Sequence, residues 1–199
     1  MSNSCKISYK TPTVNDRSEI THTSKKAYMF LSMTGDGSGE TETIPTDSTF
    51  PSSTMLTFTD NSINISNSET INFINVDTNG NKVNNGGSTR FVLNGTGQYQ
   101  LSLHLTSSTN VTGAVTALIQ MIDNVNVDGT GGNDGDILGI IRSYENNSLL
   151  MLGGSCIFNV DRSVVAIRIV LLSSNTLPVT ILKDSSPLGK PTIGIVKLN

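Results

Sequence analysis

Between Gln98 and Thr106 the chain alternates strictly between polar and hydrophobic positions. A period of two predicts a half-buried β-strand, with one face on a hydrophobic core and the other exposed or in an interface. The preceding Asn94–Gly97 segment breaks this pattern and allows positive φ angles, which predicts a tight bend. We therefore expect two strand segments joined by this bend, with core side chains at Phe91, Tyr99, Leu101, Leu103 and Leu105.

From Met55 to the C-terminus the same kind of pattern predicts about ten short strands separated by turn signals. Val164–Leu172 is hydrophobic on both faces, which is typical of a central strand covered on both sides, so Ile167 and Ile169 are expected in the core. No long window combines helical periodicity with helix caps. The sequence therefore predicts an all-β fold, an antiparallel β-sandwich of two sheets.

The first 53 residues differ in composition from the rest of the chain. Their one convincing strand, Ala27–Met33, is followed by a polar stretch rich in Gly and Thr, Thr34–Phe50, which predicts a loop or an arm. We expect residues 1–53 to form an N-terminal assembly arm and residues 54–199 to form the sandwich domain. Hydrophobic side chains of the arm itself would anchor it on a sheet edge or on a neighbouring subunit. These anchors are Tyr28, Phe30 and Leu31.

Composition narrows the classes of partner. Charged residues make up 15% of the chain and the net charge is −3, so no global basic field attracts nucleic acid or anionic lipid. No stretch approaches the ~18 hydrophobic residues of a membrane span, and the N-terminus lacks the hydrophobic centre of a signal peptide. We expect neither nucleic-acid binding nor membrane insertion. Low charge with many Ser, Thr, Asn and Gly residues fits an extracellular or particle-associated β protein.

The two cysteines, Cys5 and Cys156, are too far apart in the sequence for a zinc knuckle or a thioredoxin-type motif. Cys156 lies in a hydrophobic strand and is expected to be a buried small hydrophobic residue. A disulfide between the two is the alternative.

The segment from Asp123 to Asp136 is the richest carboxylate cluster in the chain. Carboxylate oxygens are ligands suited to calcium, but their spacing does not match an EF-hand, and Asp, Asn and Gly also form ordinary turns. We therefore expect an exposed loop with no cofactor. The alternative is a calcium site, and its candidate ligands are Asp123, Asp128, Asp134 and Asp136.

Of the two histidines, His22 and His104, the second lies on the polar face of the alternating strand. A Ser-His-Asp triad would need a nucleophile elbow of the form Gly-x-Ser-x-Gly, which the chain lacks. We expect His104 to be a surface or interface histidine that adds pH sensitivity to a subunit contact, and we do not expect an enzyme.

Three blocks between about residue 70 and the C-terminus carry a family resemblance. In the first, an aromatic residue, a bend, a glycine and a tyrosine lead into an alternating strand, here Phe91, Gly97, Tyr99 and Leu101–Leu105. In the second, a polar turn separates a strand from a strongly hydrophobic one, here Cys156–Phe158, Asn159–Arg162 and Val164–Leu172. The third is a C-terminal strand around a glycine, Thr192–Leu198. Together these blocks resemble the C1q and tumour-necrosis-factor superfamily.

This resemblance implies a single jelly roll that assembles as a trimer, binds other proteins and has no enzymatic activity. Related single jelly rolls occur as capsid, penton and fibre-head proteins of viruses and as spore-coat proteins. The composition and the polar N-terminal region resemble a virion component, so we predict a capsid or penton subunit in a virus particle. Its partners would be itself, as a trimer or pentamer, and other capsid or surface proteins. The alternative is a trimeric module on an extracellular or spore surface that binds a receptor or a glycan.

Overall fold

The computed structural model describes residues 27–32, 41–46, 54–58, 63–84, 87–182 and 191–199. Every regular element in these ranges is a β-strand, which confirms the predicted all-β class. In this part of the chain no helix is long and apolar enough to cross a membrane. The strands are β1 (Tyr28–Ser32), β2 (Thr41–Ile44), β3 (Thr54–Met55), β4 (Ile63–Ile65), β5 (Ile71–Val76), β6 (Ser88–Asn94), β7 (Gly97–Val125), β8 (Gly131–Val160), β9 (Val164–Ser173), β10 (Val179–Leu182) and β11 (Thr192–Lys197).

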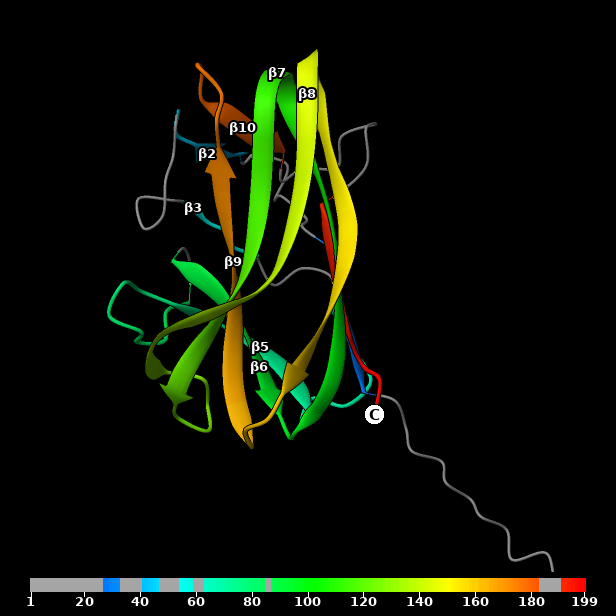
Figure 1. Ribbon diagram of the computed structural model, residues 1–199. Helices are drawn as coiled ribbons and strands as arrows, with labels where there is room; N and C mark the ends of the chain where they lie inside the picture. The colour runs from blue at the N-terminus through cyan, green and yellow to red at the C-terminus, as the bar shows by residue number, and fades with distance from the viewer. Residues whose placement is uncertain (1–26, 33–40, 47–53, 59–62, 85–86, 183–190) are drawn as a thin grey trace, which may run out of the picture.

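Two long strands, β7 and β8, run through both layers of the sandwich (Figure 1). They contain 29 and 30 residues and pair with each other antiparallel from the Gly97–Val160 end to the Val125–Gly131 end. The first part of β7 pairs with β11, whereas its second part, Val115–Ile122, pairs with β9. Each long strand therefore contributes one part to each layer.

Layer 1 has the strand order β4, β1, β11, β7 and β8, and layer 2 has the order β5, β6, β9, β7 and β8. β3 pairs with β9 beyond the end of β6, on the same edge of β9. β10 pairs with β2 and β7. A main cluster of buried hydrophobic residues drawn from both layers fills the space between them. Neighbours in a layer are often distant in sequence, which is the crossed connectivity of a jelly-roll sandwich.

The passage of β7 between the layers depends on an interruption of its ladder with β8. The register shifts between Thr106 and Asn110 and again at Val111–Thr112, and such bulges bend a strand. The buried Ser107 hydroxyl satisfies the interrupted backbone, because it accepts a hydrogen bond from the Leu150 amide (2.8 Å) and donates one to the Thr109 carbonyl (2.7 Å). The polar residues around Thr109 and Asn110 thus form a bulge inside one long strand.

The side chains expected in the core are all buried: Phe91, Tyr99, Leu101, Leu103, Leu105, Ile167 and Ile169. Phe91 meets the Phe58 ring edge to face, with 5.8 Å between the ring centroids. Because these side chains come from β6, β7 and β9, they join strands of both layers.

Two segments of the predicted N-terminal arm pair with strands of the sandwich. β1 lies inside layer 1 between β4 and β11, and its Met29 and Leu31 side chains belong to the core. β2 pairs with β10, and Ile44 is buried. Of the predicted arm anchors, Leu31 therefore packs in the core, whereas Tyr28 and Phe30 point outward and are exposed. The sequence predicts the strand itself, but its polar surroundings gave no sign that it pairs inside the sandwich. The remainder of residues 1–53, apart from Ala27, Pro45 and Thr46, lies outside the described residues.

Replacing Leu103 with alanine removes a buried side chain between the layers. Leu103→Ala should lower the free energy of unfolding by about 2–5 kcal/mol, because a cavity forms where the side chain packed. Ser102→Ala, at the next position but facing outward, should change it by less than about 0.5 kcal/mol. Urea unfolding at one fixed protein concentration would compare the unfolding free energies of the two variants. An equal loss of unfolding free energy in both would contradict the assigned orientation of the strand.

Candidate functional site

The outer face of layer 1 is the most distinctive surface in the described part of the chain. Alternation along each strand turns one set of side chains to the core and the other set outward. The outward set, which we call the layer 1 face, comprises Tyr28 and Phe30 on β1, Thr192, Gly194 and Val196 on β11, Gln98, Gln100, Ser102 and His104 on β7, and Met151, Gly153, Ser155, Ile157 and Asn159 on β8.

The strand register arranges the layer 1 face in rows across four strands. The central row runs Phe30, Gly194, Ser102, Ser155, so three of its four residues are small. The row on one side runs Tyr28, Val196, Gln100, Ile157. On the other side Thr192 and Gly153 flank His104. The small residues of the centre allow another backbone to approach closely.

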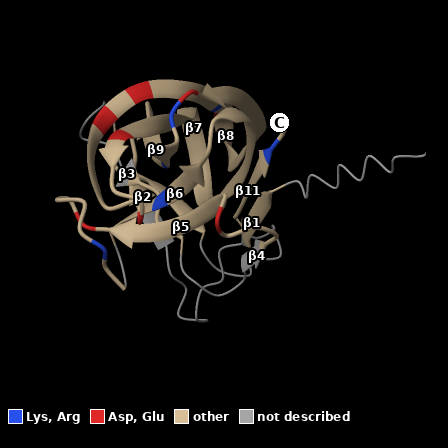
Figure 2. Cartoon of the chain, turned by 90° about the horizontal axis from the view of Figure 1, so that it is seen from below, with Lys and Arg blue, Asp and Glu red and all other residues tan. Residues whose placement is uncertain are grey.

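None of the residues of the layer 1 face is Asp, Glu, Lys or Arg. Figure 2 shows that β1 carries no charged residue, whereas acidic residues mark the curved β7–β8 ribbon. Four large hydrophobic side chains of the face are exposed, and the most exposed are Met151 at 61% and Ile157 at 56%, followed by Phe30 and Tyr28. An uncharged surface with exposed hydrophobic side chains is suited to contact with another protein surface.

Tyr99 fixes the start of β7, beside the layer 1 face. Its buried hydroxyl donates a hydrogen bond to the Gly95 carbonyl (2.9 Å), and its ring stacks on Phe158 with 6.2 Å between centroids. Burial raises the pKa of Tyr99 to about 12. Gly97, at φ +140°, has no room for a Cβ because the backbone oxygen of Asn199 lies against it. The Tyr and Gly of the family resemblance thus shape the bend between β6 and β7.

The acidic segment from Asp123 to Asp136 forms the tip of the β7–β8 hairpin, and its carboxylates do not converge. Asp123 pairs with Arg162, and Asp134 pairs with Arg168 at 2.7 Å. Asp128 accepts hydrogen bonds from the hydroxyl (2.7 Å) and the amide (3.0 Å) of Thr130, which lower the pKa of Asp128. Within the described ranges no group of three or more His, Cys, Asp or Glu residues is placed to hold a metal ion.

Two buried arginines hold this tip against the outer surface of layer 2. Arg90 on β6 and Arg168 on β9 lie directly opposite each other in the ladder and are only 5% and 6% exposed. Burial, and secondarily the neighbouring Arg168, lower the pKa of Arg90. Sequence reasoning did not single out either arginine, although both interrupt hydrophobic strands, which is the available signal.

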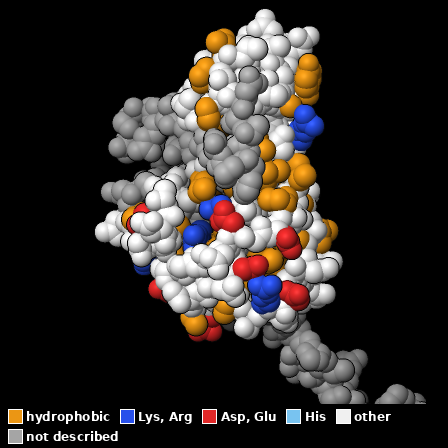
Figure 3. All heavy atoms as spheres, turned by 60° about the vertical axis from the view of Figure 1, so that its left-hand side comes forward, with side chains coloured by type: hydrophobic (Ala, Val, Ile, Leu, Met, Phe, Trp, Pro, Cys, Tyr) orange, Lys and Arg blue, Asp and Glu red, His pale blue; other side chains and the backbone are white. Residues whose placement is uncertain are grey.

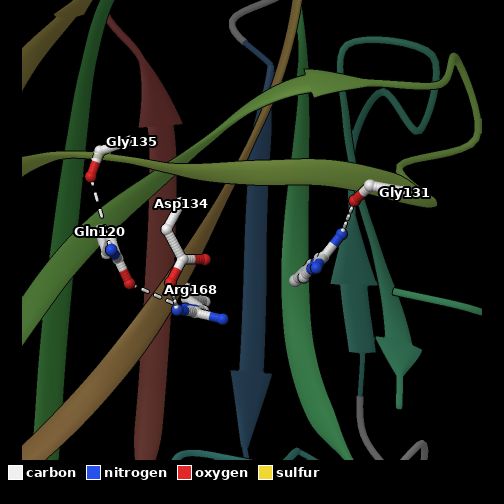
Figure 4. A network of polar contacts seen from close by, with 6 residues as sticks. Gln120, Gly131, Asp134, Gly135 and Arg168 are labelled. Atoms are coloured by element: carbon white, nitrogen blue, oxygen red, sulfur yellow. Dashed lines mark hydrogen bonds and ion pairs between the residues drawn. The ribbon is translucent and has the colours of Figure 1, made fainter. Parts of the chain in front are cut away.

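Figure 4 shows Arg168 between Gln120 and Asp134. The Arg168 Nε donates to the Gln120 side-chain oxygen at 2.9 Å. The Arg90 guanidinium donates to the carbonyls of Gly129 (3.3 Å) and Gly131. The side of the molecule seen in Figure 3 has most of its charged side chains in the lower half of the surface.

The remaining residues singled out from the sequence lie on β8 or outside the described residues. Cys156 is half-buried on β8, and burial raises the pKa of its thiol. Cys5 and His22 lie outside the described residues, so the Cys5–Cys156 disulfide stays a prediction. Asp136 is exposed on β8.

Comparisons with known proteins were made for the whole chain. No model of a protein family matches it, and neither does any curated protein. Among solved structures it is similar to murine APRIL at pH 5.0, with 12% identity and a TM-score of 0.44 over 87% of this chain and 100% of that chain. It is also similar to Eiger TNF from S. frugiperda, with 11% identity and a TM-score of 0.44 over 87% of this chain and 92% of that chain. The jelly-roll assignment rests on the strand order and pairing of this chain.

The buried Tyr99 phenol makes stability depend on pH in the alkaline range. Its pKa is raised from about 10 to about 12, so the stabilisation by the neutral phenol is complete below about pH 10 and is lost as the pH rises through 12. Denaturant unfolding should show a larger loss between pH 10 and 12 for the wild type than for Tyr99→Phe. Tyr144→Phe, which changes an exposed tyrosine, should behave like the wild type. Equal losses in all three proteins would contradict the burial of Tyr99.

Packing at the hairpin tip can be tested with two glycines that share a left-handed backbone. A Cβ on Gly129 (φ +82°) would collide with the Val92 side chain, whereas one on Gly131 (φ +65°) would meet nothing closer than 3.4 Å. Each alanine substitution should cost about 1–2 kcal/mol of unfolding free energy for the backbone. Gly129→Ala should cost about 1–3 kcal/mol more by overpacking and should speed proteolysis at the tip. Equal costs and equal cleavage would show that the tip does not pack on β6.

Proposed function

We propose that this chain is a C1q/TNF-like jelly-roll module that assembles with copies of itself through the layer 1 face and acts by binding other proteins. The observation that carries the proposal is the absence of any charged residue among the outward positions of that face. Two copies of such a face approach without like-charge repulsion and without burying an unpaired charge, which would cost several kcal/mol. The exposed Met151 and Ile157 supply hydrophobic area for the contact.

A trimer is the proposed state, and it follows from the resemblance. Identical subunits joined by heterologous contacts close into rings, so a pentamer is the second candidate state. Binding without catalysis fits the surroundings of His104, because no hydrogen bond in the described part of the chain joins it to a nucleophile or a carboxylate.

Between the two functions predicted from sequence, the integration of β1 and β2 into the sheets favours the binding module. A capsid subunit with a free arm would need neighbours to complete its structure, whereas here these strands complete the sandwich of one chain. We propose a place on an extracellular or spore surface, with a receptor or a glycan as the ligand. A capsid or penton subunit of a virion is the second candidate, and the low charge and the Ser-, Thr- and Asn-rich composition favour it.

Matched lysine substitutions on one strand test the assembly face. Ile157 and Ile140 are both exposed isoleucines of β8, at 56% and 61%, but Ile157 lies on the layer 1 face and Ile140 opposite Leu118 in layer 2. In sedimentation velocity at micromolar concentration the wild type should be an oligomer, with the mass of a trimer expected. Ile157→Lys should weaken assembly by at least about tenfold, because a buried unpaired charge is costly, while Ile140→Lys should assemble normally.

Two results would contradict this proposal. One is a wild-type protein that stays monomeric at high micromolar concentration. The other is a loss of assembly on Ile140→Lys that equals the loss on Ile157→Lys, because the contact would then not be specific to the layer 1 face.

A further inference from the structure

His104 is the one group on the layer 1 face that can change its charge near neutral pH. It points outward from β7 and is half-buried, with Gly153 of β8 and Thr192 of β11 as its direct cross-strand neighbours. A Cβ on Gly153 would lie 3.7 Å from the His104 Cδ2 atom, so the imidazole ring stands over the open space that this glycine leaves.

No countercharge faces the imidazole from the described strands packed around it. Its neighbours along β7 are Ser102 and Thr106, its diagonal neighbours on β8 are Met151 and Ser155, and β11 presents Thr192 and Gly194. None of these carries a charge, and in the described part of the chain no ion pair holds His104. A proton gained here therefore introduces an uncompensated positive charge into an otherwise uncharged surface.

We infer that His104 is a pH switch for self-assembly, so that protonation of its imidazole separates the subunits. This inference rests on the proposed function, because it requires the layer 1 face to be the contact between copies. In a rotationally symmetric assembly every copy brings the same histidine to the same contact. A neutral imidazole is tolerated in such a contact, whereas burying its charged form without a partner is costly. Imidazoles change charge between about pH 5 and 8, so assembly is strong at the upper end of this range and weak at the lower end.

The test is sedimentation velocity of the full chain at one concentration series between pH 5.5 and 7.5. The wild-type dissociation constant should rise at least about tenfold on acidification, the factor that corresponds to a displacement of one pKa unit. His104→Gln keeps a hydrogen-bond donor and acceptor but cannot gain a proton, so its assembly should stay within about threefold across the range. His104→Asn is a second uncharged variant in case the glutamine does not fold. His104→Lys, which is charged throughout, should assemble poorly at both pH values.

His22 provides a matched control, because it is the only other histidine in the chain. His22→Gln should retain the full pH response of the wild type. The inference is overturned if the wild type assembles equally well at both pH values, if His104→Gln keeps the response, or if His22→Gln abolishes it. In each of these cases an oligomer at pH 7.5 leaves the proposed function standing. A monomer at pH 7.5 overturns the proposed function, and the inference falls with it.

Discussion

The pairing of β7 with β8 along nearly their whole length is the constraint on which the rest of the structure depends. One ladder runs from Gly97–Val160 to Val125–Gly131 and supplies neighbouring strands to both layers. The bulge at Thr106–Asn110 bends this ladder, so β11 docks on one part of β7 and β9 docks on the other. Because β8 pairs only with β7 among the described strands, both layers end at the same long edge.

The same ladder gives the two outer surfaces opposite characters. In layer 2 the hairpin tip folds back over β6, where Arg90 and Arg168 bind its carbonyls and the Asp134 carboxylate. Gly129 brings the tip into contact with Val92, so this end of layer 2 is covered by its own chain. In layer 1 the small central row and its hydrophobic flanks stay uncovered within the described residues. The uncovered, uncharged surface is therefore the one suited to self-association.

Local patterns account for what could be predicted, and long-range pairing accounts for what could not. The strict alternation at Tyr99–Leu105 predicts which side chains face the core, because a strand's geometry needs no knowledge of its partners. β1 could not be placed, because its position between β4 and β11 depends on pairing with residues more than 150 positions away. The pairing of Asp123 and Asp134 with arginines was equally hidden, so calcium remained an alternative to the exposed loop that the sequence predicts. His104 was placed on the polar face, but its lack of charged neighbours emerges only from the register.

Oxidation of Met151 tests the central claim, that the layer 1 face is buried between copies. Its thioether is well exposed on a single chain and reacts readily with a mild oxidant when accessible. Oxidation rates of the assembled wild type and of the Ile157→Lys variant would be compared by mass spectrometry. The proposed assembly predicts that Met151 is protected in the wild type and reactive in the variant. Equal reactivity of Met151 in an assembled wild type and in a dissociated variant would contradict the claim.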